Sequence, residues 1–152
     1  MRKHWDEYFM DIAHQVKERS TCPRLRVGAV IVKDKRIKGT GYNGSPPHFP
    51  HCDDVGCLMI DNHCRRTIHA EVNALMECSP EERKDATIYI TDQPCMECTK
   101  LIIASGISRV VYANPYPTEV DFFAEADWIE VKCLRSLEVS EEENKEDDHA
   151  WS

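Results

Sequence analysis

The chain has 152 residues, of which 41% are hydrophobic and 30% are charged, and its formal net charge is −8. This is typical of a single globular domain with its own core, and the acidic balance argues against a large nucleic-acid-binding face. Two or three local arginines would still suffice for a small phosphorylated ligand. No apolar run approaches the roughly 18 residues that a membrane span needs. The N-terminus lacks the apolar core of a signal peptide, so we expect a cytoplasmic protein without a membrane partner.

The first third of the chain predicts one helix and one hairpin. Apolar positions recur on one helical face between residues 4 and 19, which predicts a packing helix. Residues 27–32 are a β-rich apolar run, and residues 36–42 return after a tight turn at Asp34-Lys35. Residues 43–67 are expected to form one long irregular loop. A loop of that length is usually functional or needs a cross-link that holds it in place.

Helices and strands are expected to alternate in the rest of the chain. We predict helices over 69–78, 95–105 and 118–126 and strands over 86–91, 109–112 and 128–132, with Gly106 as the C-cap of the middle helix. An opening hairpin followed by alternating strands and helices predicts an α/β fold, a three-layer α-β-α sandwich around a five-stranded mixed sheet. One domain spans 1–139. Residues 140–152 are an acidic tail that we expect to be disordered.

The most informative motif pairs His69-Ala70-Glu71 with Pro94-Cys95-Met96-Glu97-Cys98. An imidazole and two thiols suit zinc, and cysteines at i and i+3 share one helical face. A single C-x-x-C is more often a structural or redox motif. Here, however, the ligands stop at three, which leaves a position for water as in catalytic zinc sites. Glu71 is the acid/base that such a water needs, so we predict a metal-assisted hydrolase with Glu71 as its catalytic residue.

Four further cysteines lie in or beside the long loop: Cys22, Cys52, Cys57 and Cys64. Four thiols would make a closed, tetrahedral structural zinc site and would explain how a loop without a core is ordered. His51 or His63 would be able to replace one of the cysteines. The alternative is a set of free thiols in a flexible loop. Cys78 and Cys133 have the pattern of ordinary core or surface thiols.

The chain resembles the cytidine deaminase-like superfamily and, within it, the deoxycytidylate (dCMP) deaminases. The resemblance covers about residues 5–132 and rests on these stretches: 27–32, Gly41-Tyr42-Asn43-Gly44, 67–74, 94–98, and 110–112 to Tyr116. H-x-E followed by P-C-x-x-C is a signature of zinc nucleobase deaminases. The resemblance implies zinc-dependent hydrolysis of dCMP to dUMP and ammonia, which feeds thymidylate synthesis. It also implies zinc on His69, Cys95 and Cys98, with Glu71 as the proton shuttle.

The same resemblance implies residues that contact the substrate. It places Asn43 near the sugar, Tyr116 near the substrate and the backbone around Ala70 in the base pocket. Asn-Gly is also a common hairpin turn, and Tyr116 lies among prolines where it would serve equally well in loop packing. A monophosphate needs positive groups, and the candidates are Arg24, Arg26, Arg65 and Arg66. An exposed arginine is, however, usually only solvated.

Family members are commonly homohexamers, activated by dCTP and inhibited by dTTP with magnesium (Mg2+), and some carry a second, structural zinc. The resemblance implies the same here, with the loop after Tyr42 as the candidate effector site. Other interpretations stay open. A tRNA adenosine deaminase shares the zinc motif but needs a basic RNA-binding surface. A riboflavin-pathway deaminase is usually fused to a reductase domain. A zinc-stapled interaction module, which is not an enzyme, would leave Glu71 without a role.

Overall fold

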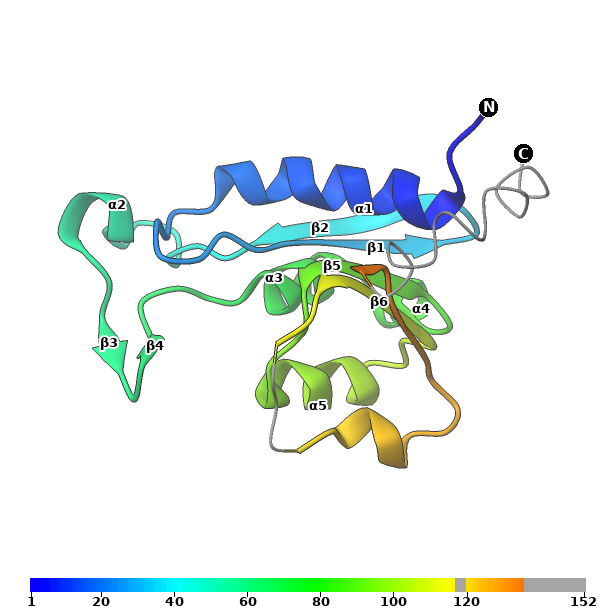
Figure 1. Ribbon diagram of the computed structural model, residues 1–152. Helices are drawn as coiled ribbons and strands as arrows, with labels where there is room; N and C mark the ends of the chain where they lie inside the picture. Colours follow the sequence, from blue (N-terminus) through cyan, green and yellow to red (C-terminus); the bar gives the residue numbers. More distant parts are fainter. Residues whose placement is uncertain (117–119, 136–152) are drawn as a thin grey trace.

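The computed structural model describes residues 1–116 and 120–135, and five of its strands form one mixed sheet (Figure 1). The order across the sheet is β2-β1-β5-β6-β7. The bounds are β1 Gly28–Lys33, β2 Arg36–Tyr42, β5 Thr87–Asp92, β6 Arg109–Asn114 and β7 Glu130–Cys133. β1 is antiparallel to both β2 and β5, whereas β5, β6 and β7 run parallel. The predicted five-stranded mixed sheet is confirmed.

Helices cover both faces of this sheet. α1 (Trp5–Val16) lies on one face, and α3 (Ala70–Glu77) and α5 (Met96–Ala104) lie on the other (Figure 1). β1 is buried on both sides because its side chains alternate between the two cores. Val30 packs with α1, whereas Ala29 and Ile31 pack with the opposite helices. The three-layer sandwich is therefore confirmed. No helix within residues 1–116 and 120–135 is both long and apolar enough to cross a membrane.

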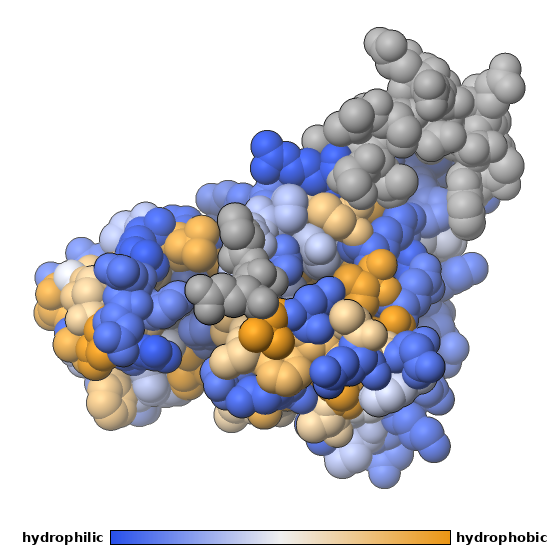
Figure 2. Space-filling view, turned by 60° about the horizontal axis from the view of Figure 1, so that its bottom comes forward, coloured by the Kyte–Doolittle hydropathy of each residue, from blue (hydrophilic) through white to orange (hydrophobic). Residues whose placement is uncertain are grey.

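The long loop was the largest error of the sequence prediction. Residues 43–67 contain a short helix, α2 (Cys52–Val55), and a small hairpin of β3 (Met59–Ile60) and β4 (His63–Cys64). We call residues 51–66 the arm, because they extend away from the sheet (Figure 1). Four of its apolar side chains, at Val55, Leu58, Met59 and Ile60, are 44–56% exposed, and Figure 2 shows apolar surface at this end of the molecule. Such short strands lack the periodicity that a sequence pattern needs.

Three helical segments also depart from the predictions. The first helix ends at Val16 and continues as a 3-10 turn, Lys17–Arg19. A short helix, α4 (Pro80–Arg83), was missed, although Ser79 and Glu82 form the capping box that would have indicated it. The expected helix over 118–126 is a 3-10 helix, η2 (Phe122–Glu125), and residues 117–119 lie outside the described residues. The acidic tail, and the domain end at 139, also lie outside them.

Gly41 lets α3 lie directly on β2. A Cβ atom at this position would be 2.3 Å from the carbonyl oxygen of Ala70 and 2.4 Å from the backbone nitrogen of Ala74. We expect Gly41→Ala to displace α3 and to cost about 1–3 kcal/mol in unfolding free energy. Because α3 follows directly after the predicted metal ligand His69, bound zinc should fall as well. Thermal unfolding and zinc analysis would check this, with the neighbouring Thr40→Ala as the control; unchanged values for Gly41→Ala would contradict it.

A buried carboxylate ties α1 to three strands. Asp6 accepts hydrogen bonds from Tyr89 Oη at 2.8 Å, from Lys132 Nζ at 2.8 Å, and from Arg109 Nη1 and Nη2 at 2.6 and 2.7 Å. Burial alone would raise the pKa of Asp6. The hydrogen bonds from Arg109, Lys132 and Tyr89 outweigh burial and hold that pKa far below its usual range. Sequence patterns did not indicate this network, because its members are distant in the chain.

Replacing Asp6 with alanine should lower the unfolding free energy by about 3 kcal/mol, because Arg109 and Lys132 lose their shared carboxylate partner. The sign of the pH dependence follows from the lowered pKa. The contribution of Asp6 to the unfolding free energy is full above its unfolded-state pKa of about 4, and it is lost as pH falls toward the folded-state pKa. Urea unfolding of both proteins at pH 7 and pH 3 would test this, and an equal difference at the two pH values would contradict it.

Candidate metal centre

The three predicted ligands of the open site lie together. His69 Nδ1 is 3.2 Å from Cys98 Sγ and 3.5 Å from Cys95 Sγ, and all three donor atoms lie within 4.8 Å of one another. Tetrahedral zinc with ordinary bond lengths places nitrogen and sulfur ligands about 3.6 Å apart. The observed distances are close to that value, and one imidazole with two thiols is a donor set that zinc prefers. These residues therefore fit a zinc ion.

Both halves of this site stand at helix N-termini. His69 is the N-cap of α3, and Cys95 is the N-cap of α5, just beyond the carboxyl end of β5. The positive ends of the helix dipoles favour thiolate over thiol. Contact with Cys98, through its side chain and its backbone N–H, and with His69 lowers the pKa of Cys95 to about 3, although burial opposes the change. The same contact raises the pKa of Cys98, so Cys95 is the thiol that ionises first.

Glu71 lies in the first turn of α3 and is only 4% exposed. Burial raises the pKa of its carboxyl above the ordinary value, and the neighbouring His69 opposes this only in part. Its carboxyl also interacts with the Cys98 thiol. Among the residues that the structure describes, no fourth histidine, cysteine or carboxylate joins the His69, Cys95 and Cys98 group. Glu71 therefore lies beside the three-ligand set of His69, Cys95 and Cys98 without being one of its members.

The four remaining loop cysteines also come together. Cys22 Sγ lies 3.6 Å from Cys57 Sγ, Cys52 Sγ lies 3.5 Å from Cys64 Sγ, and all four sulfurs are within 4.8 Å of one another. In a tetrahedral zinc site with four thiolates, the sulfurs are about 3.8 Å apart. Burial would raise the pKa of Cys64, but hydrogen bonding, first from the Arg66 backbone, lowers it to about 7. The group includes neither His51 nor His63. We call it the four-cysteine cluster.

Asn43 has a structural task within the described residues. Its Oδ1 accepts a hydrogen bond from the Val27 N–H at 2.8 Å, and its Nδ2 donates one to the Leu25 carbonyl oxygen at 2.6 Å. These bonds fix the backbone that leads into β1. An asparagine side chain has two amide hydrogens and two carbonyl lone pairs, so one of each is left for a ligand. The proposed contact of Asn43 with substrate stays a prediction.

Tyr116 lies beside the three-ligand set. Burial, followed by the negative charges of Cys95 and Glu71, raises the pKa of its hydroxyl to about 12. Its backbone N–H donates to Gln93 Oε1 at 3.1 Å, so Gln93 holds the segment that carries the tyrosine. Gln93 was not among the predicted site residues, although its position between β5 and Pro94 was a signal. Ala70 is fully buried at the start of α3.

Arg24 and Arg26 contact the arm from outside it, whereas Arg66 lies within the arm. Arg24 Nη2 donates to the Asn62 carbonyl oxygen at 2.8 Å, and Arg66 Nε donates to that of Gly56 at 3.1 Å. Arg26 donates to the Ser20 carbonyl oxygen and lies 3.7 Å from Asp53 Oδ1. The hydrogen bond with Cys95 raises the pKa of His69, and the positive charge of Arg65 opposes this only in part. Binding of a phosphate by any of them stays a prediction.

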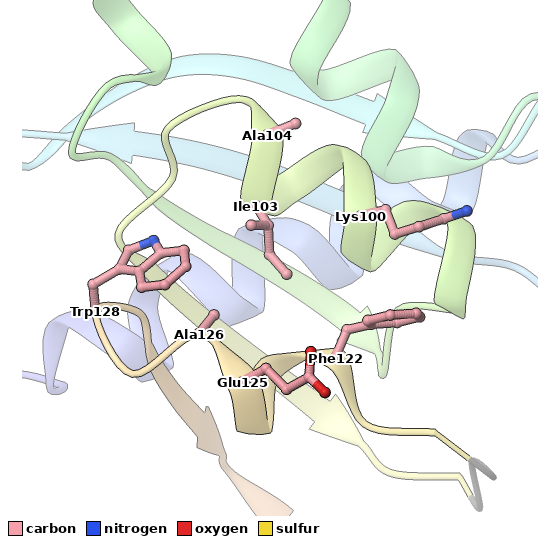
Figure 3. Close-up of a pocket in the computed structure, with 7 residues that line it drawn as sticks. All are labelled: Lys100, Ile103, Ala104, Phe122, Glu125, Ala126 and Trp128. Carbon is pink, nitrogen blue, oxygen red and sulfur yellow. The ribbon is translucent and has the colours of Figure 1, made fainter.

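A separate cavity of about 340 Å³ lies between α5 and η2 (Figure 3). Its lining is mostly apolar: Lys100, Ile103, Ala104, Phe122, Glu125, Ala126 and Trp128. None of these residues belongs to the three-ligand set or to the four-cysteine cluster. The cavity is therefore distinct from both metal-ligand groups.

Residues 3–114 match the model of the cytidine and deoxycytidylate deaminase zinc-binding region. The chain belongs to this family. It is 54% identical over 116 residues to ComE operon protein 2 of Bacillus subtilis, and the match covers 75% of this chain and 61% of that protein. It is 45% identical over 122 residues to the deoxycytidylate deaminase of Mycobacterium phage D29, and this match covers 73% of this chain and 95% of that protein.

The fold is also that of solved deaminases. The dCMP deaminase from cyanophage S-TIM5, in complex with dCMP and dUMP, matches with a TM-score of 0.72 and 31% identity, covering 84% of this chain and 94% of that one. The chain spans less than two thirds of the Bacillus relative and 42% of the yeast (Saccharomyces cerevisiae) deoxycytidylate deaminase. A tRNA:A34 deaminase structure, at 22% identity and a TM-score of 0.56, shares the fold alone.

Proposed function

We propose that this protein is a zinc-dependent dCMP deaminase, which converts dCMP and water to dUMP and ammonia. The observation that carries the proposal is the open set of His69, Cys95 and Cys98 with the buried carboxyl of Glu71 beside it. The match to the phage D29 deoxycytidylate deaminase over 95% of that protein supports the substrate. Membership of the zinc-binding family supports the metal.

In this proposal, His69, Cys95 and Cys98 hold zinc, which supplies Lewis-acid chemistry that makes a water molecule acidic near neutral pH. Glu71 accepts a proton from the attacking water and passes it to the ring nitrogen beside C4 of cytosine. Glu71 then carries the second proton of that water to the exocyclic amine, so that the C4–N bond breaks and the amine leaves as ammonia. Because burial raises the pKa of Glu71, the carboxyl holds a proton more readily than an exposed glutamate would.

The other predicted residues would bind the nucleotide. The backbone at Ala70 lines the base pocket, Asn43 contacts the sugar, and Tyr116 closes one side of the substrate. Arg24 and Arg26 are the proposed phosphate ligands, since both belong to the segment that Asn43 holds in front of β1. If they bind phosphate, Arg24 would have to exchange its present bond to Asn62 and Arg26 its contact with Asp53.

The proposal extends to a second, structural zinc in the four-cysteine cluster, supported by sulfur–sulfur distances close to those of a tetrahedral site. It also includes the physiological setting of the family. The dUMP product would supply thymidylate synthesis in the cytoplasm. dCTP would activate and dTTP with magnesium would inhibit a homohexamer, with the segment after Tyr42 as the effector site.

Ammonia release from four substrates tests the activity: dCMP, CMP, deoxycytidine and an adenosine-containing tRNA stem-loop. We expect dCMP to exceed deoxycytidine by at least about 100-fold in kcat/KM, because charge-assisted bonds to phosphate contribute several kcal/mol. Turnover of the stem-loop alone would favour the tRNA deaminase. Absence of turnover on every substrate, with zinc fully loaded, would overturn the enzyme proposal.

A further inference from the structure

The four-cysteine cluster joins segments that are far apart in the chain. Cys22 precedes β1, Cys52 begins α2, Cys57 follows that helix, and Cys64 ends β4. The β3–β4 hairpin has only two residues in each strand, which is too short to be stable alone. The apolar side chains of the arm remain largely exposed, so little core holds it. Through Cys22, the four-cysteine cluster is therefore one attachment of the arm to the body, beside the contacts that Arg24, Arg26 and Thr21 make with the arm.

One route from this cluster leads along the chain to His69, Cys95 and Cys98, which we call the catalytic set. Only residues 65–68 separate Cys64 from His69. At the far end of this segment, Ile68 makes two backbone hydrogen bonds with Gly44, of 2.8 and 3.1 Å. The segment that delivers His69 is thus fixed at one end by a sulfur of the cluster and at the other by the Gly44 backbone.

A second route passes through Thr21, the neighbour of Cys22. The Thr21 N–H donates to the Asn43 carbonyl oxygen at 3.2 Å, and Thr21 Oγ1 accepts from the Ser45 N–H at 3.1 Å. The Thr21 carbonyl oxygen accepts from the Asp53 N–H of the arm at 3.1 Å. Thr21 therefore ties the arm to residues 43–45, and the central residue of that segment is Gly44, the partner of Ile68. Both routes end at the residue before His69.

We propose that metal binding in the four-cysteine cluster positions His69 and thereby tightens metal binding by His69, Cys95 and Cys98. The inference rests on the proposed second metal site. When the cluster holds no metal, Cys64 no longer fixes one end of residues 65–68. These residues must then become ordered when the catalytic set binds metal, and this loss of conformational entropy weakens metal binding there. Groups that orient metal ligands commonly change affinity about 10–100-fold. The coupling is reciprocal, so each site tightens the other by the same factor.

Cobalt(II) reports the two sites separately. The zinc-loaded protein is exchanged into cobalt(II), which is then withdrawn with increasing chelator. Absorbance from thiolate-to-metal charge transfer should be about twice as strong for the cluster as for the catalytic set, because it has four thiolates against two. Cys57→Ser removes the one cluster cysteine that is partly exposed. We expect the catalytic set of this variant to bind cobalt about 10–100-fold more weakly. Cys133→Ser, outside both groups, should match the unaltered protein.

Two further variants separate coupling from local damage. Cys95→Ser disables the catalytic set and should weaken cobalt binding in the cluster by the same factor that Cys57→Ser weakens the catalytic set. Thr21→Val keeps all ligands but loses the bond to Ser45, and it should weaken the catalytic set about 2–30-fold. If Cys57→Ser proves insoluble, these two variants carry the test.

Two results would overturn the coupling. One is a variant that loses the four-thiolate absorbance while the affinity of the catalytic set for cobalt stays within twofold. The other is a fold-change in cobalt affinity that differs between Cys57→Ser and Cys95→Ser. One cobalt per chain would remove the second site together with this inference. Neither result would affect the deaminase proposal, which ammonia release tests independently.

Discussion

Replacing Glu71 with glutamine is expected to reduce kcat for dCMP by about 10²–10⁴-fold while zinc content stays unchanged. The amide preserves the size of the buried side chain but cannot carry a proton. Because Glu71 is not one of the three grouped ligand residues, the metal should remain bound. Glu71→Ala should lose at least as much activity. Ammonia release and zinc analysis on the same preparation provide the measurement.

Glu77→Gln is the matched control, since Glu77 is the last residue of the same helix and accepts a hydrogen bond from the Thr40 N–H on the protein surface. Its turnover should stay within about twofold of the unaltered enzyme, as expected for a surface substitution. Near-normal turnover of Glu71→Gln would overturn the proton-carrier role. Loss of zinc in that variant would instead assign Glu71 to support of the metal ligands.

Replacing Cys52 with serine should lower bound zinc from about two to about one per chain and should destabilise the protein by more than about 4 kcal/mol. Cys52 is buried, and its sulfur lies 3.5 Å from that of Cys64, so its loss opens the cluster at the base of the arm. For a domain of this size, the loss corresponds to roughly 8–16 °C in Tm. Zinc analysis and thermal unfolding would measure both effects.

Limited proteolysis would locate the damage in the Cys52→Ser variant, with new cleavage expected within residues 51–66. Cys133→Ser removes a thiol outside both metal-ligand groups and should leave zinc content, Tm and the cleavage pattern as they are. A Cys52→Ser protein that retains two zinc ions, or an unaltered protein that binds only one, would contradict a structural zinc in the cluster.

The sheet and its main helices were predictable because their patterns are local. Residues 27–32 and 86–91 are apolar runs long enough to indicate buried strands, and each lies within one residue of β1 or β5. The arm was not predictable, because β3 and β4 have two residues each and no period to detect. The Asp6 network was not predictable for another reason: Arg109 and Lys132 are more than a hundred residues away from Asp6 in the chain.

The sequence by itself determined the chemistry of the candidate site: an imidazole, two thiols at i and i+3, a nearby carboxylate and four more thiols. Ligand type and local spacing are properties of the chain, so they needed no coordinates. Only the tertiary structure decided that His69 presents Nδ1 to both sulfurs and that neither His51 nor His63 joins the cluster. It also decided that Glu71 is buried deeply enough to raise its pKa. These features depend on packing between α3, α5 and the sheet, because distances between residues far apart in the chain are set by tertiary contacts and not by spacing.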